Sequence, residues 1–195
     1  MFAGGGGFSS NPNVRRSIRL ECQNSTGPGA ANGTGYGKLC EFVDCSNGAC
    51  EHDPIRFMKP MLQSSFCLQP PGDTPTRRST FDGLLAGCIP VFFEELSARR
   101  QYGWHLPEDE YEDFSVFIPK EDVVFRGVRI LDVLMRIGRG EVRRKREKVM
   151  EMMGRVMYRK HGSSFGLRSK KDAFDIAVDG VLQRIKSRTR QLRLP

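Results

Sequence analysis

The sequence predicts an α/β fold in which helices flank a Rossmann-like parallel sheet. Two short apolar runs, residues 65–68 and 89–93, have the length of buried strands. Between them lie a turn-forming loop, 69–75, and a helical segment that Thr76 would cap and Gly87 would end. Strand, loop, helix and strand within about 30 residues form a βαβ unit, and such units join parallel strands.

The remaining segments extend this unit into one domain over residues 1–188, with a sheet of four or five strands. Strands are expected at 40–44 and 114–118, and helices at 13–22, from Asp53 as N-cap to a stop at Pro60, and at 127–137, 140–159 and 170–186. Apolar residues of the last helix recur near the 3.6-residue period and form a stripe. The glycine-rich segment 23–38 is expected to be a flexible loop, and 189–195 a basic tail.

Composition limits the classes of partner. The 195 residues carry a net charge of +8 at pH 7, which favours anionic ligands. Neither zinc-finger spacing nor an aromatic-rich RNA-binding motif accompanies the charge, so nucleic acid is not an expected partner. No apolar stretch approaches the roughly 18 residues of a membrane helix, and the sequence has no signal-peptide pattern at its start.

Cysteines and glycosylation sequons crowd one loop-rich segment. Two sequons begin at Asn24 and Asn32, and together with the cysteines they favour an oxidising lumen. The cysteine spacing does not fit a structural zinc site, so at least one disulfide is expected among Cys22, Cys40, Cys45 and Cys50. Of three connectivities, Cys22–Cys40 with Cys45–Cys50 is favoured. Cys67 and Cys88 lie inside apolar runs, where buried free thiols are expected.

The loop after the first strand of the βαβ unit has the features of an anion site. Ligands of doubly wound sheets bind at the carboxyl ends of the strands, and Arg77 and Arg78 stand there at a helix entrance. Two guanidinium groups suit a diphosphate, and Asp82 can accept hydrogen bonds from ribose hydroxyls. The alternative is structural, with arginine stems covering the helix and Asp82 on the surface. Other nucleotide motifs fail, because the glycines at 4–7 do not complete GxGxxG and no GxxxxGK[ST] occurs.

These segments also resemble a known family. Residues 65–73 (SFCLQPPGD), 76–82 (TRRSTFD) and 87–93 (GCIPVFF) are similar to the signature of exostosin-like glycosyltransferases. Residues 101–107 (QYGWHLP) and 171–175 (KDAFD) resemble the plant branch related to xyloglucan galactosyltransferases. The resemblance runs from near residue 1 to about residue 185.

The resemblance implies the C-terminal, donor-binding half of a two-domain GT-B enzyme that inverts anomeric configuration without a bound metal or other cofactor. Arg77 or Arg78 would then meet the diphosphate of UDP-galactose, and Asp82 its ribose, with xyloglucan as acceptor. Family members lie on the lumenal side of the Golgi membrane, held by an N-terminal anchor that this chain lacks. Two alternatives stay open: galacturonosyl transfer, and a truncated nucleotide-binding module without catalysis.

Four further residues are candidates for contact with the donor sugar. Glu94 and Glu95 follow the second strand of the unit, and Trp104 and His105 follow them. Their structural alternatives are solvent-exposed carboxylates and a core indole. The acidic run 108–113 is expected to be a solvated loop. The resemblance implies that the general base belongs to the other half, so no catalytic residue is predicted here.

Overall fold

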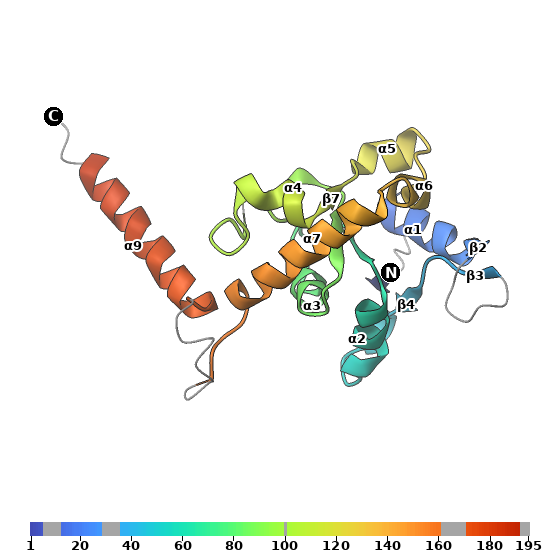
Figure 1. Cartoon of the computed structure of the whole chain (residues 1–195), viewed down its shortest axis with the longest axis horizontal. Coiled ribbons are helices and arrows are strands. Elements are labelled where there is room, and N and C mark those ends of the chain that lie inside the picture. The colour runs from blue at the N-terminus through green and yellow to red at the C-terminus, as the bar shows by residue number, and fades with distance from the viewer. Residues whose placement is uncertain (6–12, 29–35, 100, 161–170, 192–195) are drawn as a thin grey trace.

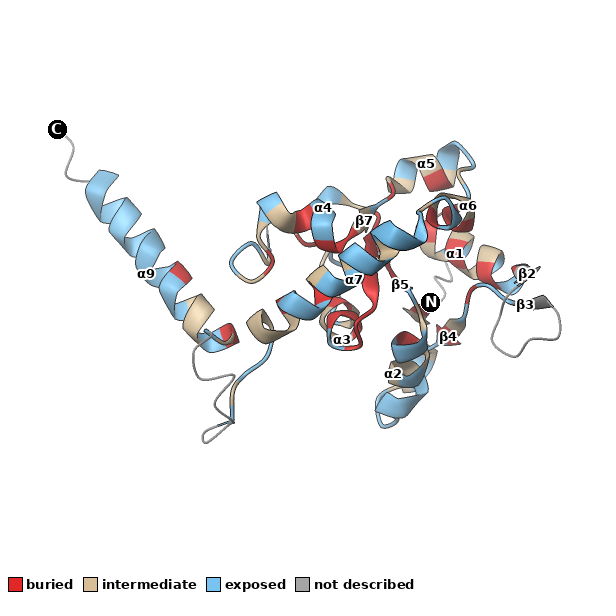
Figure 2. Cartoon of the chain, viewed as in Figure 1, coloured by how far each residue is buried: buried red, intermediate tan, exposed pale blue. Residues whose placement is uncertain are grey.

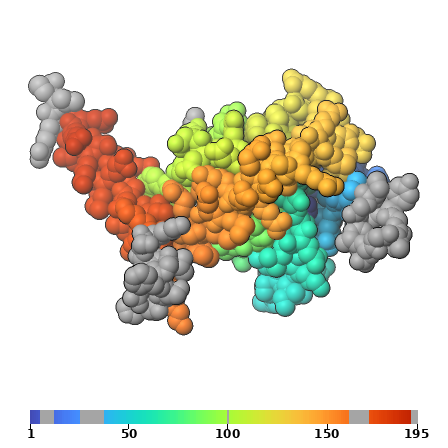
Figure 3. All heavy atoms as spheres, in the orientation of Figure 1, coloured from blue at the N-terminus to red at the C-terminus, as the bar shows by residue number. Residues whose placement is uncertain are grey.

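The computed structural model describes residues 1–5, 13–28, 36–99, 101–160 and 171–191. The long helix α7 (Arg139–Met152) crosses the face of the sheet, and helix α9 (Ala173–Gln191) extends away from the rest of the molecule (Figure 1). In the space-filling view, α7 lies across the middle of the visible face and α9 projects at one end (Figure 3).

Five parallel strands make up the sheet. They are β1 (Phe2–Gly4), β4 (Phe42–Asp44), β5 (Phe66–Gln69), β6 (Ile89–Phe92) and β7 (Val116–Phe117). One ladder pairs β1 with β4, and another has the order β5–β6–β7. Two hydrogen bonds join the ladders: the amino group of Met1 donates to the carbonyl of Phe66 (2.9 Å), and the amide of Leu68 donates to the carbonyl of Met1 (2.8 Å).

The resulting order, β4–β1–β5–β6–β7, is a flavodoxin-like doubly wound arrangement. It confirms the predicted parallel sheet and the predicted pairing of β5 with β6. In such a sheet the strand order reverses between β1 and β5, and the crevice at their carboxyl ends is the usual ligand site. The fold thus directs attention to the residues that follow Gly4 and Gln69.

Helices cover both faces of this sheet. Within the described residues, the α-helices besides α7 and α9 are α1 (Val14–Gln23), α2 (Pro54–Gln63), α3 (Ser79–Leu85), α4 (Tyr111–Phe114), α5 (Lys120–Phe125) and α6 (Ile130–Met135). Short 3-10 turns are η1 (Ser46–Gly48), η2 (Glu95–Ser97), η3 (Glu108–Glu110) and η4 (Met153–Arg155). The side chains of Asn13 and Asp53 cap α1 and α2, and Gly87 adopts φ +67° after α3.

The core forms on either side of β6, whose four residues are all buried (Figure 2). Val91 and Phe93 pack with residues of α1, α5 and α6, whereas Phe92, between them, packs with residues of α3, α4 and α7. Because successive side chains of a strand point to opposite faces, this alternation places one helical layer on each face.

Several boundaries differ from the sequence prediction. Pro60 lies inside α2, because it removes only the amide bond to Arg56, and the hydroxyl of Ser64 donates to its carbonyl one turn later (2.8 Å). Thr76 does not cap α3, which begins at Ser79; its hydroxyl instead pairs with that of Thr74 (2.9 Å).

The second half of the chain is also divided differently. The expected strand 114–118 is shortened because Phe114 belongs to α4, and the acidic run 108–113 is helical in η3 and α4. The expected helix 127–137 begins only at Ile130, since Gly127 has φ +70°. The helix expected over 140–159 ends at Met152 and continues as η4.

Helix α9 carries the predicted apolar stripe, but most of it faces solvent (Figure 2). Exposed fractions lie between 39% and 63% for Phe174, Val178, Val181, Leu182 and Ile185. The helix continues to Gln191, so the start of the predicted basic tail is helical, and residues 192–195 lie outside the described residues. Within the described ranges, none of the helices combines the length and hydropathy needed to span a bilayer.

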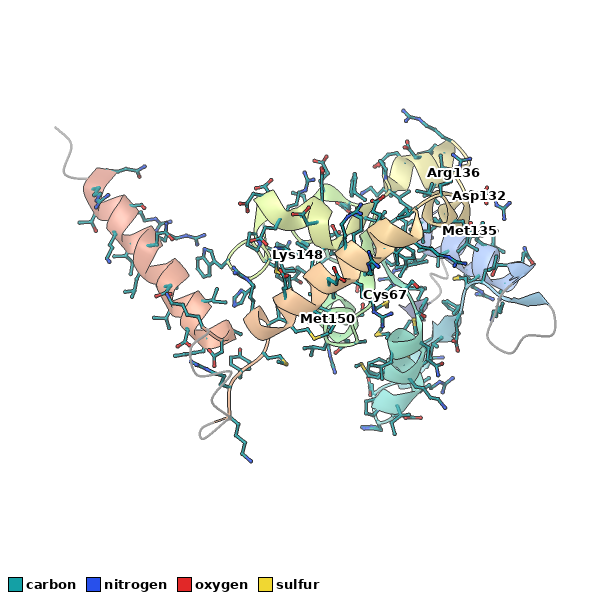
Figure 4. The ribbon with its side chains drawn as sticks, viewed as in Figure 1. Cys67, Asp132, Met135, Arg136, Lys148 and Met150 are labelled. Atoms are coloured by element: carbon teal, nitrogen blue, oxygen red, sulfur yellow. A yellow bond between two sulfur atoms is a disulfide. The ribbon has the colours of Figure 1, made fainter. Side chains whose placement is uncertain are left out.

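Three disulfides connect the described cysteines. Cys22–Cys40 and Cys45–Cys50 have the pairing that the sequence favours. The expectation of free thiols at Cys67 and Cys88 is wrong: these residues form a third disulfide (Cα–Cα 5.7 Å). Phe66 pairs with Ile89 across the β5–β6 ladder, so Cys67 on β5 lies close to Cys88, the residue that precedes β6. Figure 4 places Cys67 near the middle of the molecule, between α7 and α2 in the view.

The glycine-rich segment is not wholly loop. Its ends form two short antiparallel strands, β2 (Thr26–Pro28) and β3 (Tyr36–Lys38). Residues 29–35 between them, including the sequon at Asn32, lie outside the described residues.

One carboxylate joins two helices on the same face of the sheet. The side chain of Glu21, on α1, accepts hydrogen bonds from the amides of Ile130 (3.0 Å) and Leu131 (2.8 Å) at the start of α6. We expect Glu21→Ala to lower the free energy of unfolding by about 1.5–3 kcal/mol, because both amides lose a charged acceptor. Urea denaturation measures this change. Glu21→Gln, which keeps one acceptor oxygen, should lose less, and the exposed Glu108→Ala is the control; equal stability of all three variants would contradict the role of Glu21.

Candidate functional site

Two arginine side chains from different βα units meet at the switch point between β1 and β5. Arg15, in the first turn of α1, donates from Nε to the carbonyl of Pro71 (2.9 Å). A Cβ atom added to Gly72 would lie 2.5 Å from Nη2 of Arg15 and 2.8 Å from Nη1 of Arg77. A Cβ atom on Gly4, at the end of β1, would lie 3.1 Å from Nη2 of Arg77. The two guanidinium groups therefore lie against the backbone of glycine residues, and a side chain at Gly72 would displace them.

The electrostatics of this pair are unfavourable without a ligand. Burial lowers the pKa of Arg15, and the charge of Asp73 opposes the shift. Burial also lowers the pKa of Arg77, the charge of Arg15 adds to the lowering, and Asp73 again opposes it. Nε of Arg77 is buried and has no hydrogen-bond partner among the described residues. Two adjacent cations with an unused donor provide what a bound polyanion requires.

A buried amide ties the end of β5 to the start of α3. Gln69 is 1% exposed; its Nε2 donates to the carbonyl of Ser79 (3.1 Å), and the hydroxyl of Ser79 donates to its Oε1 (2.6 Å). Burial raises the pKa of Tyr102, while hydrogen bonds with the side chain of Thr76 and the backbone of Arg77 oppose the rise. Arg77 thus lies between the end of β5 and the start of α3, and the hydrogen bonds of Gln69 and Tyr102 hold this segment in place.

Two cavities adjoin the arginine pair. The cavity on the α2–α3 side, about 560 Å³, is lined among others by Gly4, Phe57, Met61, Arg77 and Asp82, and we call it the α3 cavity. The cavity on the α1–α5 side, about 460 Å³, is lined among others by Arg15, Gly72, Asp73, Lys120 and Val124, and we call it the α5 cavity. A ligand whose anionic centre binds both guanidinium groups has space on each side.

The two arginines predicted from the sequence have different surroundings. Arg77 lies in the pair just described, whereas the side chain of Arg78 is 88% exposed and its Nε lies 3.8 Å from Oδ2 of Asp82. Asp82 lines the α3 cavity, and burial raises the pKa of its carboxyl group while Arg78 opposes the rise. The structure therefore groups Arg77 and Asp82 around one cavity, with Arg78 at its rim.

Residues 1–134, which contain both strands of the switch point and both arginines, match the family described as the exostosin GT47 domain. The chain belongs to the exostosin GT47 family. GT47 is a glycosyltransferase family, and the crevice between β1 and β5 is therefore the candidate donor site of this chain.

The curated relatives of this GT47 chain are longer proteins of Arabidopsis thaliana. A probable xyloglucan galactosyltransferase, GT19, is 70% identical over 188 residues, which cover 96% of this chain and 42% of the relative. Xyloglucan galactosyltransferase XLT2 is 46% identical over 75% of this chain and 28% of its own length. A xyloglucan-specific galacturonosyltransferase is 38% identical over 90% and 24% of the two lengths. The chain thus spans less than half the length of these relatives.

Of the two glutamates predicted beside the donor sugar, only Glu94 approaches a cavity. It follows β6, and its Oε2 lies 3.2 Å from Nζ of Lys120, which lines the α5 cavity. Glu95 begins η2 and is exposed. Its role as a sugar contact stays a prediction.

Trp104 and His105 contact α9 rather than either of the two cavities. The guanidinium of Arg184 lies 5.0 Å from the centre of the Trp104 ring, and the same indole packs against Gly180, where a Cβ atom would overlap it. Nε2 of His105 lies 2.9 Å from the carbonyl of Ala173. This geometry gives both residues a role in anchoring α9, and it does not bring them to the arginine pair.

Three residues of the candidate site were missed by the sequence analysis: Arg15, Gln69 and Lys120. Gln69 carried a usable signal, because a single amide at the end of an apolar strand must find partners when it is buried. Arg15 and Lys120 had none, because their contacts lie 56 and 26 residues away along the chain. In the described part of the chain, no cluster of three or more His, Cys, Asp or Glu side chains is arranged to hold a metal ion.

The strain between the arginines can be tested without a nucleotide. We expect Arg77→Met to leave the free energy of unfolding unchanged or raised, because it removes a desolvated charge beside Arg15 at similar volume. The same change should abolish the rise in Tm that pyrophosphate gives the unmodified chain, since a ligand stabilises only the state that binds it. Arg78→Met is the matched control and should keep that rise. Thermal unfolding with and without pyrophosphate decides, and an Arg77→Met variant still stabilised by pyrophosphate would count against the site.

Proposed function

We propose that this GT47 chain is the donor-binding part of an inverting glycosyltransferase that transfers galactose from UDP-galactose to xylosyl side chains of xyloglucan. The observation that carries the proposal is the Arg15–Arg77 pair over Gly72, at the switch point of a doubly wound sheet. The pair lies within the segment that matches the GT47 family. The choice of sugar and acceptor rests on relatives whose names state xyloglucan galactosyl transfer.

The donor is placed by assigning each of its parts to a feature of the crevice. The diphosphate binds the two guanidinium groups, and the unpaired Nε of Arg77 supplies one further donor. The uridine extends into the α3 cavity, where the carboxylate of Asp82 accepts hydrogen bonds from the ribose hydroxyls and Phe57 and Met61 offer apolar surface. The galactose then extends into the α5 cavity.

The same pair of charges serves the chemical step. In the proposed reaction an acceptor hydroxyl attacks the anomeric carbon, the bond from that carbon to the diphosphate breaks, and UDP leaves with the bonding electrons. Negative charge grows on the leaving phosphate oxygen, and preorganised guanidinium groups lower the barrier most where charge develops. A general base in the other half of the enzyme takes the proton of the acceptor hydroxyl. Because two cations of the chain would face the diphosphate, the proposal requires no metal ion. The proposed location of the enzyme is the lumenal side of the Golgi membrane.

Two alternatives follow from specific observations. Galacturonosyl transfer is favoured by the 38% identity to a xyloglucan-specific galacturonosyltransferase. A nucleotide-binding module without catalysis is the second alternative, because the described residues assigned to the site bind the donor and none of them is assigned as the general base. Incubation of the chain with labelled UDP-sugars and xyloglucan oligosaccharide separates the classes, because a module binds the donor without transferring sugar.

Substitutions at the two predicted contacts should weaken UDP binding differently. We expect Arg77→Ala to cost about 1.5–3 kcal/mol of UDP binding, as expected for hydrogen bonds to a charged group, with only partial rescue by Arg77→Lys. Asp82→Asn should cost less, and nothing for a UDP analogue without the 2′ and 3′ hydroxyls. Calorimetry on both ligands measures the contrast; Arg78→Ala is the control. Unchanged UDP affinity in a folded Arg77→Ala variant would refute the diphosphate site.

Removal of metal ions should leave donor binding intact. We expect the affinity for UDP to change less than about twofold between excess EDTA and millimolar Mg²⁺ or Mn²⁺, because the guanidinium groups neutralise the diphosphate. Titration of the same protein sample under the three conditions is the measurement. An affinity that falls by tenfold or more in EDTA would mean that a metal ion shares the site.

A further inference from the structure

Glu94 follows β6 and Lys120 follows the neighbouring strand β7. Both residues therefore lie near the carboxyl ends of the strands, as the arginine pair does. The β6–β7 ladder continues beyond its last strand residues, because the amide of Lys120 donates to the carbonyl of Phe93 (2.9 Å). The side chains then meet with Nζ and Oε2 3.2 Å apart, 38% and 24% exposed. This register fixes a partly buried ion pair beside the α5 cavity.

We propose that the Lys120–Glu94 pair makes the site selective for an uncharged hexose over a hexuronic acid in the nucleotide-linked donor. The inference rests on the proposed function, and it names a specificity-determining pair within the same site. The α5 cavity shares Arg15 and Gly72 with the diphosphate position, so a sugar attached to the outer phosphate enters it directly.

The charges around the α5 cavity disfavour binding of the carboxylate of a hexuronic acid. Asp73 and Glu121 line it, and Glu94 stands behind Lys120. Of the two lining cations, Arg15 is engaged by the diphosphate, and Lys120 is already neutralised by Glu94. A hexuronate would bring its negative charge among three carboxylates with no free cation among the described lining residues, whereas a neutral hexose adds no charge to them.

The pair also predicts how the preference could be changed. Glu94→Gln keeps the shape of the side chain but releases the ammonium group of Lys120. A freed ammonium facing the cavity is the partner that a sugar carboxylate needs. Removing Lys120 instead leaves Glu94 unpaired and should deepen the discrimination against a uronate.

Calorimetric titration of the full chain with UDP, UDP-galactose and UDP-galacturonate tests the inference. We expect UDP-galactose to bind the unmodified chain about tenfold more tightly than UDP-galacturonate, and Glu94→Gln to remove most of that difference without changing the affinity for UDP. The double variant Glu94→Gln/Lys120→Gln should lose the gain for UDP-galacturonate, because the gain acts through the ammonium group. Glu108→Gln, which removes one negative charge at an exposed position, is the control and should leave all three affinities unchanged.

The outcomes separate the two levels of the proposal. If UDP does not bind the unmodified chain, the proposed function fails. If UDP binds every variant equally but Glu94→Gln discriminates between the sugars as the unmodified chain does, the selective role of the pair is overturned. A gain for UDP-galacturonate that survives in the double variant would also overturn it.

Discussion

The contact of two guanidinium groups over Gly72 is the constraint on which the site depends. Arg15 belongs to the unit that follows β1, and Arg77 to the unit that follows β5, so they meet only because the sheet places these two strands side by side. Two hydrogen bonds through Met1, the residue before β1, hold the two strands together. Like charges in a half-buried position lower the stability of the fold. A bound anionic ligand offsets this loss, so such a pair is typical of a functional site. Hydrogen bonds hold the residues around the pair in place: Gln69 donates to the carbonyl of Ser79, and Arg15 donates to the carbonyl of Pro71.

Local patterns in the sequence were enough to predict the central βαβ unit. The two apolar runs became β5 and β6 in the expected parallel pairing, and Gly87 took the left-handed conformation that ends α3. Arg77 and Asp82 could be proposed because position alone puts the residues after β5 at the ligand edge. Each of these predictions depends on residues within one short segment, so it can be made from the sequence without knowing the tertiary structure.

What could not be predicted depends on contacts between segments. Arg15 and Lys120 enter the site through strand order and ladder register, which no local pattern states. Cys67 and Cys88 looked like buried thiols because an apolar run is the same for a free or a paired sulfur, and only the register of β5 against β6 brings them together. The sequence predicts a helix stop at Pro60, yet one proline near the end of a helix removes a single amide hydrogen bond, and here the hydroxyl of Ser64 donates to the carbonyl of Pro60.

The α3 and α5 cavities differ in how far apart along the chain their lining residues lie. Apart from Glu51, the polar side chains that line the α3 cavity come from one stretch, residues 76–82. The same stretch lies within the segment that matches the family, and it supplies the proposed diphosphate and ribose contacts. The α5 cavity combines side chains from α1, from the loop after β5 and from the start of α5, and Glu94 reaches it only through Lys120. A change at one of these dispersed positions can alter the charge around the sugar while leaving the nucleotide side intact. Under the proposed placement of the donor, this division would allow relatives of similar identity to this chain, 46% and 38%, to differ in the sugar for whose transfer they are named.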